Sequence, residues 1–95
     1  METSILLVEQ QMTLIKNVAY LAANGVYHED KMRFILTRAV SHMSCLGGTE
    51  ESASKKLLGL AIEKELSHLH IQNPRYEEAL RCALHDLMTL PPILV

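Results

Sequence analysis

The chain has 95 residues, of which 48% are hydrophobic, with a mean hydropathy of +0.09 and a formal net charge of −2 at pH 7. This length fits one domain, residues 1–95, which is too small to bury every apolar side chain, so we expect an apolar surface that serves association. The slightly acidic balance argues against a protein dominated by nucleic-acid binding, because that affinity rests on many Lys and Arg contacts with phosphates.

The first half of the chain predicts a hairpin of two helices over residues 4–45. Apolar residues recur at steps of three and four over residues 4–23 and again over residues 28–45, which is typical of helices with one buried face. The Gly-Gly pair that follows is the clearest helix breaker in the sequence, and it places a linker at residues 46–49.

The second half predicts another helical hairpin, over residues 50–90. One helix is expected from about 49 to 71 and the next from about 74 to 90. Asn73 is a good N-cap, and Pro74 suits the first helical position, where its missing N–H is no loss. The residues predicted to be buried in this hairpin are Leu57, Leu58, Ala61, Ile62, Leu66, Leu69, Leu80, Ala83, Leu84, Leu87 and Met88.

No stretch shows the sustained alternation that predicts strands, so the predicted class is all-α. Short turns favour antiparallel neighbours, which gives two antiparallel helical hairpins. Pro91 and Pro92 end the last helix, and the apolar tail 91–95 is expected to dock on the domain or on a partner.

The second hairpin carries a spacing of small and aromatic residues that matches a known repeat. Small Ser67 precedes the turn, Tyr76 and Ala79 follow it, and Pro91 comes twelve residues after Ala79. In this spacing the hairpin resembles a tetratricopeptide repeat, in which small residues let two helices approach closely and a proline ends the unit. Asp86 departs from the pattern, which has an alanine at that position.

The first hairpin carries a fainter copy of the same pattern, with Gly25, Tyr27 and an acidic run in its turn. Asp30 occupies the small-residue site, and Tyr27 and Tyr76 lie 49 residues apart, against a period of about 34 in the family. The resemblance implies a tetratricopeptide-repeat-like fold; the alternative is an ordinary pair of helical hairpins whose tyrosines belong to the core.

In size, apolar richness and its Gly-x-Tyr-His-Glu turn, the chain looks like the small chaperones of type III secretion that hold needle subunits. That resemblance implies a cytosolic chaperone that clasps an amphipathic helix of a secretion-system subunit. It also implies a complex with another small helical protein, and a homodimer is the alternative. The residues that the family pattern places on the partner-binding surface are Met12, Ile15, Ala19, Ala22, Ala61, Lys64, His68 and Ile71.

Two cysteine–histidine pairs, His42 with Cys45 and Cys82 with His85, each share one helix face and together have the ligand types of a Cys2His2 zinc site. The spacing is not that of a standard finger, and two separate helices would have to align. Buried cysteines with histidines at the rim are the favoured interpretation. We therefore expect no metal and no cofactor.

No catalytic constellation stands out, and no nucleophile elbow, phosphate loop or glycine-rich fingerprint occurs, so an enzyme is not expected. The alternative to a chaperone is a small dimeric regulatory protein that acts on transcription or on a partner enzyme. Transcriptional control would want a recognition helix rich in basic and amide side chains, and neither the second nor the fourth predicted helix has that composition.

Compartment and membrane contact are predicted from what the sequence lacks. Cys45 and Cys82 are its two cysteines, a number that fits a reducing compartment. The first residues lack the basic segment of a secretory signal, and no apolar run approaches the ~20 residues that span a bilayer. We expect a cytoplasmic protein without membrane insertion.

Overall fold

The computed structural model describes residues 2–48, 50–68 and 73–91. Every regular element of these residues is a helix, which confirms the all-α class. The helices are α1 (Glu2–Ala23), α2 (Glu29–Gly47), α3 (Glu51–His68) and α4 (Pro74–Met88).

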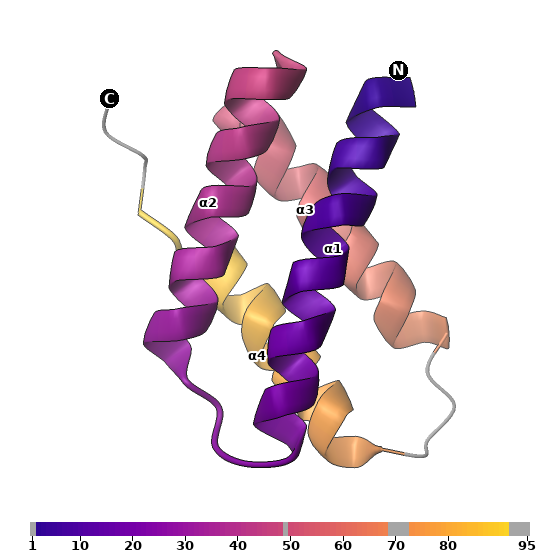
Figure 1. Ribbon diagram of the computed structural model, residues 1–95, viewed down its shortest axis with the longest axis vertical. Helices are drawn as coiled ribbons and strands as arrows, with labels where there is room; N and C mark the ends of the chain where they lie inside the picture. The colour runs from indigo at the N-terminus through magenta and orange to yellow at the C-terminus, as the bar shows by residue number, and fades with distance from the viewer. Residues whose placement is uncertain (1, 49, 69–72, 92–95) are drawn as a thin grey trace.

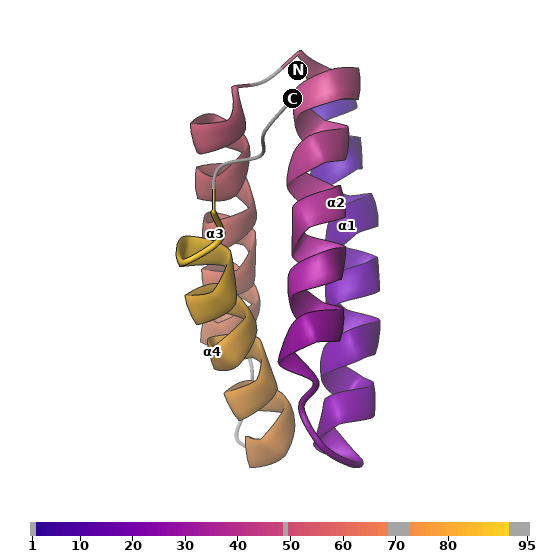
Figure 2. The ribbon, with the colours of Figure 1, turned by 90° about the vertical axis from the view of Figure 1, so that its left-hand side faces the viewer.

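The helices run alternately down and up, so that α1 with α2 and α3 with α4 are two antiparallel hairpins (Figure 1). Viewed from the side, α1 and α2 form one layer, and α3 and α4 form a second layer packed against it (Figure 2). Helix α1 packs most closely against α4 and α2, and least closely against α3. A tetratricopeptide-repeat-like arrangement is compatible with this packing and stays a prediction.

The helix ends follow local chemistry and differ from the predicted bounds by a few residues. Helix α2 continues to Gly47, because the residue that ends it is Gly48, whose φ of 64° is the left-handed conformation that glycine adopts readily. The predicted linker at 46–49 is therefore helical at its start. The predicted end of the third helix, residues 69–71, lies outside the described residues. So do residues 92–95 of the predicted apolar tail.

The start of α4 is the predicted one. The side chain of Asn73 accepts a hydrogen bond from the backbone N–H of Tyr76 at 3.1 Å, and Pro74 opens the helix. At the other end, the N–H of Thr89 bonds the carbonyl of His85, which closes the helix at Met88, two residues before the predicted end. Asn73 thus satisfies one of the N–H groups that a helix leaves without a partner at its first turn.

One core lies between the two layers and receives side chains from all four helices. Its fully buried apolar members are Ile15, Ala19, Met32, Leu36, Ala39, Val40, Leu58, Ile62, Leu80, Ala83 and Leu87. Each large member stabilises the fold by about 1.5–3 kcal/mol through removal of apolar surface from water.

The prediction that Leu57 and Met88 are buried is wrong. Leu57 is 38% exposed and Met88 is 69% exposed. Both lie at the edge of the apolar face of their helix, where the neighbouring helix does not reach them, and each borders a groove. The two grooves beside them are therefore candidate binding surfaces.

Candidate functional site

A groove of about 520 Å³ runs between α1 and α3. It exists because α1 and α3 pack against each other less closely than either packs against its partner in the same hairpin. The residues that line it are Val8, Glu9, Met12, Thr13, Lys16, Leu57, Ala61, Lys64, Glu65 and His68.

The floor of this α1–α3 groove is apolar. Met12 is 9% exposed and closes the groove from beneath, and Leu57 stands at its wall with 38% of its surface in water. Ala61 is half-buried and short, which keeps the space above it open. A partner could cover this floor with apolar side chains, and such burial is the main driving force of association.

The rim of the groove carries both signs of charge. Lys16 on α1 and Glu65 on α3 bridge it with an ion pair of 3.5 Å. Glu9, Lys64 and His68 are exposed at its edges. A pair this exposed contributes only about 0–1 kcal/mol, so a partner with its own charges can replace it at little cost.

The predicted partner-binding residues divide into three groups. Met12, Ala61, Lys64 and His68 line the α1–α3 groove together. Ile15 and Ala19 have no exposed surface and belong to the core, so the closed domain does not offer them to a partner. Ala22 borders a different pocket, of about 240 Å³, beside Tyr27, and Ile71 lies outside the described residues.

Sequence reasoning missed the other residues of the groove, although a signal for them existed. Glu9, Thr13 and Lys16 follow each other at steps of four and three on α1, one strip away from its buried face. Leu57 and Glu65 on α3 stand four residues before and four residues after the predicted Ala61. A strip that borders the buried face of a helix is where a groove wall forms when the neighbouring helix stands apart.

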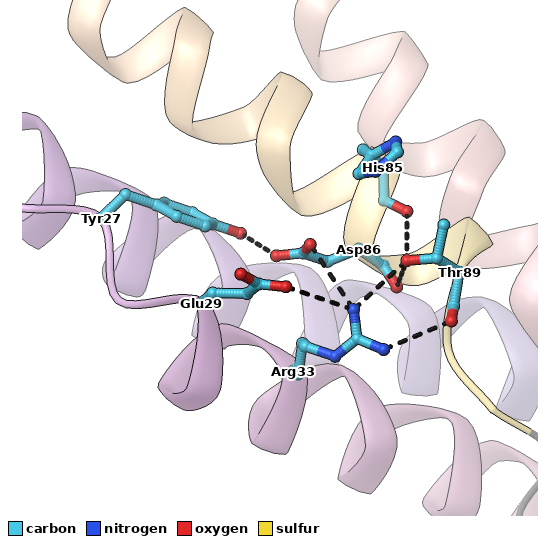
Figure 3. Close-up of polar contacts among 6 residues, drawn as sticks. All are labelled: Tyr27, Glu29, Arg33, His85, Asp86 and Thr89. Carbon is cyan, nitrogen blue, oxygen red and sulfur yellow. Dashed lines mark hydrogen bonds and ion pairs between the residues drawn. The ribbon is translucent and has the colours of Figure 1, made fainter.

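Apart from the groove, a cluster of polar side chains joins the two hairpins at α4 (Figure 3). The hydroxyl of Tyr27 donates a hydrogen bond of 2.7 Å to the carboxylate of Asp86, whose side chain is 6% exposed. The guanidinium of Arg33 lies 3.8 Å from the other carboxylate oxygen of Asp86 and 3.5 Å from Glu29. Arg33 also donates to the hydroxyl and carbonyl oxygens of Thr89, at 3.2 and 3.3 Å.

This Tyr27–Asp86 site explains the residue that departs from the repeat pattern. Asp86 is buried at a position where the pattern has an alanine, and it is held there by partners from the first hairpin. Burial, and then the hydrogen bond and charge of Asp86, raise the pKa of Tyr27 well above its usual value. The phenol of Tyr27 therefore stays protonated and can donate the hydrogen bond that joins the two hairpins.

The cysteine–histidine pairs do not assemble. Among the described residues, no group of three or more His, Cys, Asp or Glu side chains could hold a metal ion. Cys45 is exposed, so its predicted burial is wrong, and Cys82 is half-buried. Burial, and then the carboxylates of Glu78 and Asp86, raise the pKa of the Cys82 thiol, which makes it a weak nucleophile at neutral pH.

No protein-family description matches the chain, and no curated protein and no solved structure is significantly similar to it. The resemblance to tetratricopeptide-repeat chaperones therefore stays a prediction from the residues quoted for it. None of the helices, over the residues that the structure describes, is long and apolar enough to cross a bilayer.

Proposed function

We propose that this chain is a protein-binding helical module, a small cytosolic chaperone that holds an amphipathic helix of a secretion-system subunit in the α1–α3 groove. The observation that carries the proposal is the combination of an apolar floor at Met12, Leu57 and Ala61 with a rim of both charges. The identity of the subunit, the cytoplasmic location and a second small helical protein in the complex come from the family resemblance.

The dimensions of the groove suit a short helical segment. Its lining residues span positions 8–16 on α1 and 57–68 on α3, which correspond to about 12 and 17 Å of helix at 1.5 Å per residue. Two to three turns of a partner helix would fit, with apolar side chains at steps of three and four directed at the floor.

The charges at the rim of the groove predict which charges the partner should carry. Lys16 and Glu65 neutralise each other across the groove. With that pair kept, Glu9 on the α1 side favours a basic residue, and Lys64 on the α3 side favours an acidic one. An amphipathic helix with basic residues along one border of its apolar stripe and acidic residues along the other meets both demands. Such complementary charges fix orientation and suppress wrong partners more than they add affinity.

The test compares two variants in each of which a glutamate replaces a leucine. Leu57→Glu puts a charge into the groove wall, and Leu14→Glu puts the same charge on α1, outside the groove lining, at a leucine that is 47% exposed. Each tagged protein, after circular dichroism has shown that it is folded, is used to capture polypeptides from its host. The helical segment of any captured protein is then titrated as a synthetic peptide by calorimetry.

The proposal expects a partner that the wild type and Leu14→Glu bind alike and that Leu57→Glu binds at least tenfold more weakly. A partner that both variants bind equally well would move the binding site away from this groove. The absence of any helical partner that discriminates between the two variants would overturn the proposal.

A further inference from the structure

Helix α3 is bordered by a second groove on its other side, between α3 and α4. This α3–α4 groove has a volume of about 540 Å³, and Gly59 and Leu84 are among the residues that line it. Leu60 and Met88 stand at its edge with 54% and 69% of their surface exposed. Two large apolar side chains in water beside a groove indicate a surface that is covered in some assembly.

Among the residues that line the α3–α4 groove, two charges stand one turn from Leu60 on the outer face of α3. Lys56 lies one turn before it and Glu63 one turn after it, and all three residues line the α3–α4 groove. The two charges are seven residues, or about 10.5 Å, apart along the helix, which is too far for an ion pair between them. Among the described residues neither forms an ion pair, whereas Lys16, Arg33, Lys55 and Arg81 do.

The order lysine, leucine, glutamate is self-complementary for antiparallel helices. If a second α3 lies antiparallel to the first, with a two-fold axis between Gly59 and Leu60, Lys56 of each copy stands level with Glu63 of the other. The two Leu60 side chains then meet at the axis, beside the open floor that Gly59 leaves. Two-fold symmetry needs one patch that complements itself, and this patch does so in charge.

We propose that the outer face of α3, together with the α3–α4 groove, is a two-fold interface between two copies of this chain. The occupant of the groove is Leu60 of the second copy, with Met88 closing the apolar patch, and the two Lys56–Glu63 contacts set the antiparallel register. We expect a face made of one helix and the edge of another to bury less than the about 800 Å² per partner of a standard interface, so the dimer should be weak and reversible.

Charge reversal tests the register directly. Lys56→Glu and Glu63→Lys each replace two attractive contacts across the axis by two repulsive ones, so each variant alone should dimerise at least tenfold more weakly. The double variant restores attraction and should dimerise like the wild type. An equimolar mixture of the two single variants should form a mixed dimer, because every facing pair is then of opposite sign. Sedimentation velocity over a concentration series measures all four.

Lys31→Glu provides the matched control, since it makes the same charge change at an exposed position of α2, in the other layer. It should leave the dissociation constant within twofold of the wild type. A wild-type chain that stays monomeric at several hundred micromolar overturns the proposal. So does a double variant that fails to recover, or a Lys31→Glu protein that is weakened as much as Lys56→Glu.

This test is independent of the proposed chaperone function. It uses the chain alone, and Leu57→Glu, whose side chain lies in the α1–α3 groove, should leave the dimer intact. Failure of helix capture would therefore say nothing against the dimer, and a monomeric chain would say nothing against helix capture.

Discussion

The hydroxyl of Tyr27 and the carboxylate of Asp86 are joined by a hydrogen bond of 2.7 Å across 59 residues of sequence. Tyr27 lies in the turn of the first hairpin, and Asp86 lies near the end of the second. With Arg33 as a second partner, Asp86 fixes how the two layers sit on each other (Figure 3). An apolar core alone tolerates some sliding of helices, whereas a buried directional contact specifies one arrangement.

Tyr27→Phe removes this hydrogen bond without removing the ring. Because the acceptor is a buried carboxylate, we expect the free energy of unfolding to fall by about 1.5–3 kcal/mol. Urea unfolding followed by circular dichroism measures it. Tyr20→Phe is the control, since Tyr20 is 51% exposed and its hydroxyl has no hydrogen bond among the described residues; it should change stability by less than about 0.5 kcal/mol. An equal loss of stability in Tyr27→Phe and Tyr20→Phe would contradict the stabilising role of the Tyr27–Asp86 hydrogen bond.

Asp86→Ala installs the residue of the repeat pattern and should still destabilise the protein. It leaves the Tyr27 hydroxyl without its acceptor and leaves Arg33 with Glu29 and Thr89 as its partners, and we expect the free energy of unfolding to fall by about 2 kcal/mol. Adding Tyr27→Phe to it should cost little more, with a coupling energy of at least about 1 kcal/mol in the double-mutant cycle. An Asp86→Ala protein more stable than the wild type would contradict the claim that the contacts of Asp86 with Tyr27 and Arg33 stabilise the fold.

Stability should fall in alkaline solution because of two tyrosines. Burial raises the pKa of Tyr76 to about 12, and it raises the pKa of Tyr27 as well. In the unfolded chain a tyrosine titrates near 10. Above that pH the unfolded state loses protons that the folded state keeps, so the free energy of unfolding declines as pH rises from about 10 through about 12. Below pH 10 these phenols contribute no pH dependence.

Urea midpoints between pH 8 and pH 11.5 measure this decline. Tyr27→Phe removes one of the two groups and should make the decline shallower above pH 10. The same slope in the variant and the wild type would mean that Tyr27 titrates alike in the folded and unfolded states, against the raised pKa.

The helices could be predicted because their signals are local. Apolar steps of three and four, the Asn73 cap and the glycines all act within a turn or two of where they stand. The α1–α3 groove could be predicted in part, because four of the predicted binding residues line it: Met12, Ala61, Lys64 and His68. Ile15 and Ala19 share the same stripe of α1, and only the packing of the other layer decides that they are fully covered.

Other features depend on contacts that no local pattern records. Asp86 looks like a flaw in a repeat until its partners, one of them 59 residues away, are known. Met88 has the right spacing for the buried stripe of α4, yet it lies beyond the reach of the neighbouring helices and is exposed. Which helix faces meet is set by tertiary packing, and a single sequence carries little information about it.

The hydroxyl of Tyr76 is buried and has no hydrogen-bond partner among the described residues. Its ring stacks on that of Tyr20, with centroids 4.2 Å apart. Tyr76→Phe keeps the stacking and removes the unsatisfied oxygen, so we expect the free energy of unfolding to rise by about 1 kcal/mol. A clear loss in thermal and urea unfolding would show that the hydroxyl has a partner in solution.

Two glycines with different backbones should respond in opposite directions to the same substitution. Gly59 is inside α3, and a Cβ there would meet Leu84 and Leu87 at ordinary contact distances of 3.7 and 3.9 Å. Gly59→Ala should therefore raise the free energy of unfolding by about 0.5–1 kcal/mol, because alanine loses less backbone entropy in a helix. Gly48 has open space around it but a φ of 64°, so Gly48→Ala should lower stability by about 1–2 kcal/mol. Urea unfolding of both variants decides the matter: changes of the same sign would mean that available space, and not backbone conformation, governs these sites.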